Sequence, residues 1–331
     1  MKDYINRING SIEDYQDTIT QNSYLANPLS HVAVFAIVFA ILPLLIGRET
    51  LLGIIVAFGT FAMAYNLLLG YTGLVSFGHA AFFGVGSYVF IFSINAGYSL
   101  ILTLGVVLIV AGLLGAAFGY IALKRRGLYF AMITLALAQG IYGYIFASGF
   151  TGGDDGLLLQ TREIALIPGF LLDFTQLLNA YYFILAIAVI TMIIIYRIVH
   201  SPFGLTLKSI RENEERAEHL GYNVQFCLLN AFVISAAFSG IAGAMLISII
   251  GITSPENVHW LTSGEVLVMA LLGGIHTFIG PFVGAVVFYV LSELFLALTD
   301  TFQLFLGAAL LVVVLFFPEG IVGRLRKVFD Q

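Results

Sequence analysis

Long apolar runs, separated by short polar segments, restrict most strongly what this chain can fold into. Ten of them follow residue 30, at 31–46, 50–69, 80–96, 99–122, 128–148, 180–199, 224–250, 262–275, 279–297 and 302–317. About 20 apolar residues are enough for a helix to cross a bilayer. Because lipid offers no hydrogen bonds to the backbone, helices are the natural spanning structure for runs of this length. The sequence therefore predicts an all-α polytopic membrane protein with about ten transmembrane helices.

Composition supports the same class and argues against several others. Of the 331 residues, 60% are hydrophobic and 10% are charged, whereas soluble domains contain about 25% charged residues. The single cysteine, Cys227, excludes an intrachain disulfide and a cysteine-based metal cluster. The chain also lacks a Walker loop, zinc-ligand spacing and a defensible Ser-His-Asp arrangement. We therefore expect a protein that is not an enzyme, with no catalytic residues, metal, cofactor or nucleic-acid partner.

Three of the runs, 31–46, 262–275 and 302–317, are shorter than a regular span. They could be tilted, half-inserted or broken, which is tolerated where a segment is buried in protein or lines a cavity. Two counts are therefore open at this point: ten spans, or eight spans with a re-entrant hairpin.

Basic residues are concentrated in three stretches, which set the orientation of the chain. They are Lys124, Arg125 and Arg126, then Arg197, Lys208, Arg211 and Arg216, then Arg324, Arg326 and Lys327. Since Lys and Arg are enriched in cytoplasmic loops, all three stretches are expected inside, and even numbers of spans separate them. Both termini are then cytoplasmic, loop 149–179 faces outward, and Glu265 and Glu293 lie near the outer ends of their spans.

This topology divides the chain into three parts. Residues 1–30 form a polar cytoplasmic segment whose apolar residues repeat at helical spacing, as in a short amphipathic helix, although a disordered tail fits nearly as well. Residues 31–317 form the membrane domain, which includes the outer loop and a cytoplasmic loop at 200–223. Residues 318–331 form a basic cytoplasmic tail.

The stretch 71–89 combines an apolar composition with many glycines and several polar side chains. Each glycine within a helix costs about 1 kcal/mol relative to alanine, so close packing, a helix break or the lining of a path should offset that cost. Together with a later segment, it supplies our expected packing glycines: Gly73, Gly78, Gly84, Gly86, Gly273, Gly274 and Gly280. Polar residues expected at a gate or path are Thr72, Ser76, His79, Thr134 and Gln139.

The cytoplasmic loop 200–223 is longer and more charged than a connection between two spans requires. Ser201 and Pro202 can start a helix, the residues from Leu205 to Leu220 favour one, and Gly221 can end it. Two interpretations are equally open: a helix that docks a cytoplasmic partner, or a solvated linker helix.

Several motifs together resemble one family. The sequence Gly70-Tyr-Thr-Gly-Leu-Val-Ser-Phe-Gly-His-Ala-Ala-Phe-Phe-Gly84 is similar to the signature of branched-chain amino acid ABC transporter permeases. Other pieces resemble the M-type (LivM) permease of that pair, and they occur in the expected order between residues 70 and 284: Arg125–Leu135, Thr151–Leu157, Ser201–Glu214, and Gly273-Gly274 to Gly280-Pro281.

The resemblance implies an ABC importer permease fold in a bacterial inner membrane, surrounded by membrane lipid. It implies four kinds of protein subunit in the complete importer: this chain, a second permease of the LivH type, two cytoplasmic ATPase subunits and a periplasmic substrate-binding protein. Loop 200–223 would then carry the coupling helix. Glu215, Ala217 and Gly221 match the spacing of the EAA-type loop of ABC permeases, and Arg216 replaces its middle alanine. The expected coupling residues are Arg211, Glu212, Asn213, Glu214, Glu215, Ala217 and Gly221.

The family resemblance implies transport of branched-chain, hydrophobic amino acids. Close relatives in the family carry urea or short amides, so a urea or amide importer permease is the main alternative. A secondary transporter or channel that works alone is a third possibility. The lack of paired ionisable residues at the centre of the predicted spans and the presence of the charged loop both disfavour it.

Overall fold

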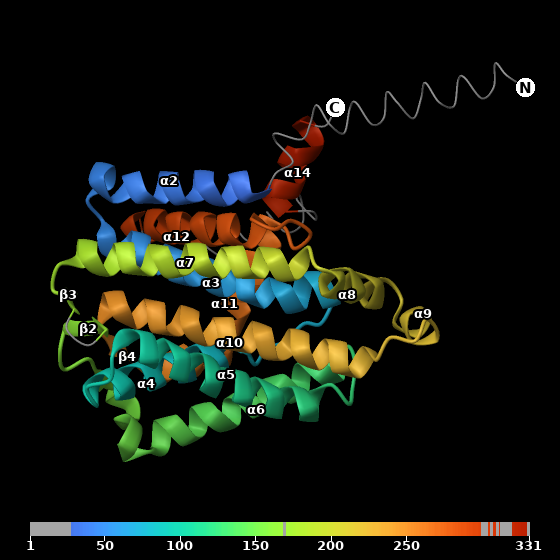
Figure 1. The fold of residues 1–331 in the computed structure, drawn as a ribbon, viewed down its shortest axis with the longest axis horizontal. Coiled ribbons are helices and arrows are strands. Elements are labelled where there is room, and N and C mark those ends of the chain that lie inside the picture. The colour runs from blue at the N-terminus through green and yellow to red at the C-terminus, as the bar shows by residue number, and fades with distance from the viewer. Residues whose placement is uncertain are drawn as a thin grey trace, which may run out of the picture.

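The computed structural model of the chain describes residues 28–167, 170–298, 304, 307–308, 311 and 320–329. The predictions for the segment before residue 28 and for most of the run 302–317 fall outside these residues. Nearly all of the described chain is helical, and two small strand pairs lie at one end (Figure 1).

Six of the described helices are long and apolar enough to cross a membrane. They are α3 (Glu49–Thr72), α5 (Leu100–Ala122), α6 (Leu128–Ala147), α7 (Leu177–Val199), α10 (Val224–Ile250) and α12 (Gly280–Leu298). The prediction of a helical, multi-pass membrane protein is thereby confirmed. Three further apolar helices have shorter spanning segments: α2 (Pro28–Ile46), α4 (His79–Asn95) and α11 (Trp260–Gly273).

The long helices lie side by side, so the molecule has two distinct ends (Figure 1). One end carries α8 (Pro202–Glu212), α9 (Glu214–His219) and α14 (Gly320–Phe329), and we refer to it as the α8 end. At the opposite end, the strand end, β1 (Leu157–Leu158) pairs with β4 (Ile252–Thr253), and β2 (Glu163–Ile167) pairs with β3 (Phe170–Asp173). Short 3₁₀ turns occur there at η2 (Gly149–Thr151) and η3 (Gly153–Asp155), and η4 (Pro255–Val258) follows β4.

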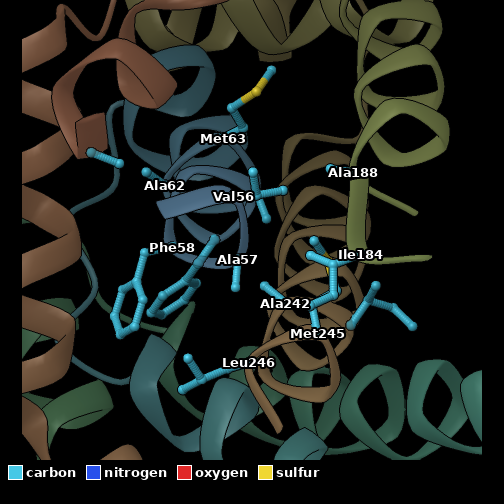
Figure 2. Packing of buried hydrophobic residues seen from close by; sticks show 14 of the residues in the cluster. Val56, Ala57, Phe58, Ala62, Met63, Ile184, Ala188, Ala242, Met245 and Leu246 are labelled. Atoms are coloured by element: carbon cyan, nitrogen blue, oxygen red, sulfur yellow. The ribbon is translucent and has the colours of Figure 1, made fainter. Parts of the chain in front are cut away.

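Helices α3 and α10 form the centre of the molecule. In their most apolar windows 89% of the α3 residues and 72% of the α10 residues are buried by the rest of the chain, against 28% for α6. Figure 2 shows Val56 and Ala57 of α3 on the side that faces Ile184 of α7 and Ala242 of α10 in this core. Helices α2, α5, α6, α7 and α12 leave apolar side chains exposed, as expected for surfaces that contact lipid, whereas α4 has no exposed residue.

Small residues allow the helices around α10 to approach closely. A Cβ added at Gly86 of α4 would overlap the backbone of Gly240 on α10, and one added at Gly115 of α5 would lie 2.5 Å from the Cβ of Ala236. Lipid supplies no hydrophobic drive between helices, so such close van der Waals packing is a main source of association. These glycines therefore serve packing within this chain.

The polar loop at the α8 end contains two helices instead of the single helix that its composition predicts. Asn213 is extended, with φ of −160°, and its side-chain oxygen accepts a hydrogen bond from the Arg216 amide at 2.8 Å. Asparagine is a favoured N-cap because its side chain satisfies a free amide in the first turn. It therefore ends α8 and starts α9, which turns the second helix away from the first.

Replacing Gly86 by valine is expected to force α4 away from α10, because the new side chain would overlap the Gly240 backbone. Overpacking of this kind costs about 1–3 kcal/mol. Thermal unfolding in detergent, followed by the emission of the single tryptophan, Trp260, should show a lower midpoint. Gly105→Val is the matched control, because no atom lies within 4 Å of a Cβ at Gly105. Equal shifts in both variants would contradict the packing role.

Candidate functional site

In the described part of the chain, two helices begin inside the molecule, and the segments that precede them are not α-helical. Helix α3 ends at Gly73, which has φ of +75°, and residues 74–78 lead back to the start of α4 at His79. Similarly, residues 251–259 connect the end of α10 to the start of α11 at Trp260. The candidate site lies where these two starting points meet.

His79 connects three helices through hydrogen bonds and is completely buried. Its Nε2 lies 2.9 Å from Ser235 Oγ on α10, and Ser235 Oγ donates to the carbonyl of Ala64 on α3 at 2.6 Å. Because the Ser235 hydroxyl proton is used on Ala64, the neutral tautomer with a proton on Nε2 satisfies this part of the network. The His79 Nδ1 then accepts from Ser76 Oγ at 2.9 Å.

This network fixes how deeply α4 begins. Ala64 lies eight residues before the end of α3 at Thr72, and Ser235 lies eleven residues after the start of α10 at Val224. At about 1.5 Å per residue, His79 is therefore about 12–16 Å from the α8 end of these helices. Helix α4 thus crosses only part of the molecule, and the extended segment before it covers the remainder.

Other helices supply partners for the backbone of this extended segment. The Ser76 amide donates to the Tyr65 hydroxyl at 3.3 Å, and the Phe77 amide donates to Thr134 Oγ1 on α6 at 3.2 Å. A Cβ at Gly78 would lie 2.6 Å from the Thr134 carbonyl, so the segment packs directly on α6. These bonds matter because unpaired backbone groups are costly in a membrane.

The structure brings together three of the five expected path residues, Ser76, His79 and Thr134. Thr72 instead donates to the Leu68 carbonyl of its own helix at 2.7 Å. Gln139 lies farther along α6, and its buried side-chain oxygen has no hydrogen-bond partner among the described residues. The three residues that come together hold a helix start in place.

The start of α11 lies against the start of α4. The Ala80 amide donates to Ser263 Oγ at 2.8 Å, so the first turns of the two helices are joined. The chain reaches this point by packing along α4: Ser87 Oγ lies 2.6 Å from Thr253 Oγ1, and a Cβ at Gly84 would overlap Val258.

This arrangement corrects the predicted position of Glu265, which we expected near the outer end of a span. Glu265 follows Ser263 by two residues and precedes the end of α11 at Gly273 by eight. At about 1.5 Å per residue, it lies about 12 Å inside the α8 end. The prediction was wrong because the polar segment 251–261 looks like an outer loop in the sequence, whereas it runs inward along α4. Glu293, in contrast, forms an ion pair with Arg48, which directly precedes α3 at the strand end, at 3.2 Å.

At the α8 end, two arginines attach the short helices to the rest of the molecule. Arg126, in the turn between α5 and α6, forms a bidentate pair with Glu214 of α9, with a shortest distance of 2.7 Å. Arg211 of α8 donates to the Gly70 carbonyl at the end of α3 and lies 3.1 Å from His276 Nδ1 in the α11–α12 connection.

The seven expected coupling residues divide into two groups by exposure. Arg211, Glu214 and Ala217 are buried or half-buried and face the protein, whereas Glu212, Asn213, Glu215 and Gly221 are exposed. Gly221 has φ of +89°, the left-handed conformation in which a glycine commonly ends a helix. Sequence reasoning missed Arg126, whose place directly before α6 gave no sign of a partner nearly ninety residues away.

The expected packing glycines serve different purposes. A Cβ at Gly273 would overlap the backbone of Gly280, so these two join α11 to α12. Gly73 caps α3 and lies next to the Arg211 side chain, and Gly274, with φ of +113°, ends α11 close to Gly320. Among the described residues, no group of three His, Cys, Asp or Glu side chains could hold a metal ion.

Comparison with known proteins gives one family. The model of the permease component of branched-chain amino acid transport systems matches residues 47–315. The chain is similar to the high-affinity branched-chain amino acid transport system permease protein LivM of Escherichia coli K12, with 26% identity over 292 residues, covering 80% of this chain and 67% of LivM.

Two other relatives match over most of their own length. LivH of Escherichia coli K12 is 26% identical over 286 residues, and BraD of Pseudomonas aeruginosa is 25% identical over 284 residues. Each match covers 80% of this chain and 90% of the relative. No solved structure gives a significant match.

Replacing Ser235 by alanine should destabilise the protein, because the variant loses the hydrogen bond from α10 to Ala64 and leaves His79 Nε2 without its partner. An unsatisfied buried polar group costs about 1–3 kcal/mol. The measurement is again the thermal midpoint from Trp260 emission. Ser248→Ala is the matched control, since Ser248 is also buried on α10 but bonds only within its own helix. If Ser248→Ala lowers the midpoint as much as Ser235→Ala, the network does not join the helices as described.

Proposed function

We propose that this chain forms half of the translocation path of an ABC importer. The chain belongs to the family of permease components of branched-chain amino acid transport systems. The importer would lie in a bacterial inner membrane and be driven by separate ATPase subunits. The observation that carries the proposal is the pair α8–α9, an exposed charged unit attached to the membrane helices on two sides. A solvated linker would not need attachments of this kind.

The names of the relatives support a hydrophobic amino acid as substrate. LivM, LivH and BraD are all named as branched-chain amino acid permeases. The similarity to both LivM and LivH also supports pairing with a second permease of the same fold. A periplasmic binding protein would deliver the substrate to the strand end, and two ATPase subunits would bind at the α8 end.

The positions of the basic residues support an α8 end that faces the cytoplasm. The pair Arg126–Glu214 brings the first and second basic stretches together at this end. Gly320 lies next to Gly274, which brings the start of α14, and with it the third stretch, to the same end. At the strand end the charged residues are mainly acidic: Asp154, Asp155, Glu163 and Asp173. This distribution follows the enrichment of Lys and Arg in cytoplasmic loops.

The path of the chain supports ten crossings with both termini inside. From α2 to α12 the described chain passes between the two ends nine times, if the extended segments before α4 and α11 are counted with their helices. Helix α14 lies at the α8 end, so an even total of crossings between α2 and α14 agrees with the proposed count of ten.

Coupling would proceed through the two arginine contacts. When the ATPase subunits close on ATP, they would move α8 and α9 together. Arg126 would transmit this motion to the α5–α6 turn, and Arg211 would transmit it to the end of α3 and to the α11–α12 connection. The helices beyond these points would then rock and change the side on which the path is open.

Charge reversal at the exposed Glu215, or valine at Gly221, should uncouple ATP hydrolysis from uptake. Glu215 lies on the free face of α9, and valine at Gly221 would be strained at φ of +89°. In vesicles that contain the complete transporter, we expect uptake per ATP hydrolysed to fall about fivefold or more. Glu163→Lys at the strand end is the control for adding a lysine. Normal uptake per ATP in both α9-region variants would contradict the docking role.

A further inference from the structure

Helix α11 carries a carboxylate that points out of the molecule at a depth where lipid would surround a single chain. Glu265 lies about 12 Å inside the α8 end, measured along α11. A second measure gives a similar depth. The Ser235–Ala64 bond places His79 about 12–16 Å inside the α8 end, and the next residue, Ala80, donates to Ser263, two residues before Glu265. The two distances agree, so Glu265 lies well within the length of the helices that a membrane would surround.

The Glu265 side chain is nevertheless exposed. The residues beside it and one turn farther along α11, Val266, Met269 and Ala270, are buried against the protein, so Glu265 lies at the edge of the buried side of the helix. No hydrogen bond or ion pair joins the Glu265 carboxylate to another residue in the described part of the chain. Tyr289 of α12 and the exposed Glu256 of η4 are within electrostatic range of it. The carboxylate thus stands free on one face of the molecule.

Lipid is an unfavourable environment for that face. A carboxylate inside a membrane is costly, and such residues face a bundle interior or a water-filled cavity. The shallow groove between α5 and α10 shows the contrast, because it is lined by apolar residues: Leu108, Ile109, Gly112, Leu113, Ala116, Val233, Ile234, Ala237 and Phe238. The α5–α10 side is therefore suited to lipid, and the α11 face requires another protein surface and water.

We propose that Glu265 lines the translocation path at the contact with the second permease and binds the ammonium group of the amino acid as it passes. This rests on the proposed function, which supplies the second permease and the amino acid substrate. A hydrophobic amino acid crosses as a zwitterion, and its ammonium group loses water in a narrow path. A carboxylate is the strongest side-chain acceptor for that group, since hydrogen bonds between ionised partners are about twice as strong as neutral ones.

Uptake by the complete transporter in vesicles, with its binding protein and ATP, tests the role of the charge. Glu265→Gln keeps the shape and removes the charge, and we expect leucine uptake to fall about tenfold. Glu265→Asp keeps the charge and should retain most of the uptake, which a purely steric role would not explain. Glu293→Gln is the control, because Glu293 is an exposed α12 carboxylate whose partner is Arg48. Uptake by Glu265→Gln equal to that of the control would overturn the proposal.

Accessibility tests the position separately. In a Cys227→Ser background the chain has no other cysteine, so Glu265→Cys can be labelled alone with a charged, membrane-impermeant thiosulfonate. We expect labelling in the assembled transporter and slower labelling when substrate-loaded binding protein is present. Leu113→Cys, on the apolar α5 face, should remain unlabelled. Absence of label at Glu265→Cys would overturn the proposal whatever the uptake results.

Failure of the proposed function gives a different result. If wild-type vesicles show no uptake of leucine that depends on ATP, the importer assignment fails. If wild-type uptake is normal and either Glu265 measurement fails, only the role of Glu265 is wrong.

Discussion

The requirement that every backbone group be satisfied inside the membrane governs the architecture of this protein. Two segments, 74–78 and 251–259, lead to helix starts within the bundle and are not α-helical. In the first, side chains of α3 and α6 receive the free amides. In the second, β4 pairs with β1 at the strand end, and the 3₁₀ turn η4 then satisfies itself, with the Asn257 amide donating to the Ser254 carbonyl at 3.1 Å. Non-helical backbone at this depth is stable only because it is enclosed by protein. Hydrogen bonds to neighbouring helices therefore help to hold the starts of α4 and α11 in place, in addition to the packing of their side chains.

The contact between the two helix starts explains why so many small polar residues are found at the centre of an apolar chain. Ser263 receives the Ala80 amide, and Ser235 bridges His79 to α3. The first amides of a helix have no partner within the helix, so a helix that begins inside a bundle needs acceptors from its neighbours. Serine supplies an acceptor without the volume that would separate the helices. The glycines around Gly86 and Gly240 act in the same direction, since they let α4 and α10 approach closely enough for these bonds.

Much of this fold could be predicted from the sequence, and the parts that could not share one physical cause. Apolar runs report which residues avoid water, so they predicted the helices and the polar loop at 200–223. They do not report where in the membrane a helix begins. Glu265 was misplaced because the polar segment before it resembles a loop. The inward course of that segment depends on its tertiary contacts with Gly84 and Ser87 of α4. Likewise, the division of α8 from α9 depends on the Asn213 cap. At the site, sequence reasoning selected Ser76, His79 and Thr134, but not Ser235, which bonds to His79, or Ser263, which accepts from the Ala80 amide.

Helix α11 gives a direct mechanical connection between the coupling end and the interior. Its last residue, Gly273, is close to the connection in which His276 meets Arg211 of α8, and its first turn is bonded to α4 through Ser263. A helix of 14 residues is about 20 Å long, and it moves as a rigid body because its hydrogen bonds are internal. A displacement of α8 would therefore reach the start of α4 and the Glu265 side chain without passing through a flexible segment of α11. Under the proposed function, the same helix would receive the motion of the ATPase subunits and present the carboxylate to the path, so docking and substrate contact would be coupled through one element.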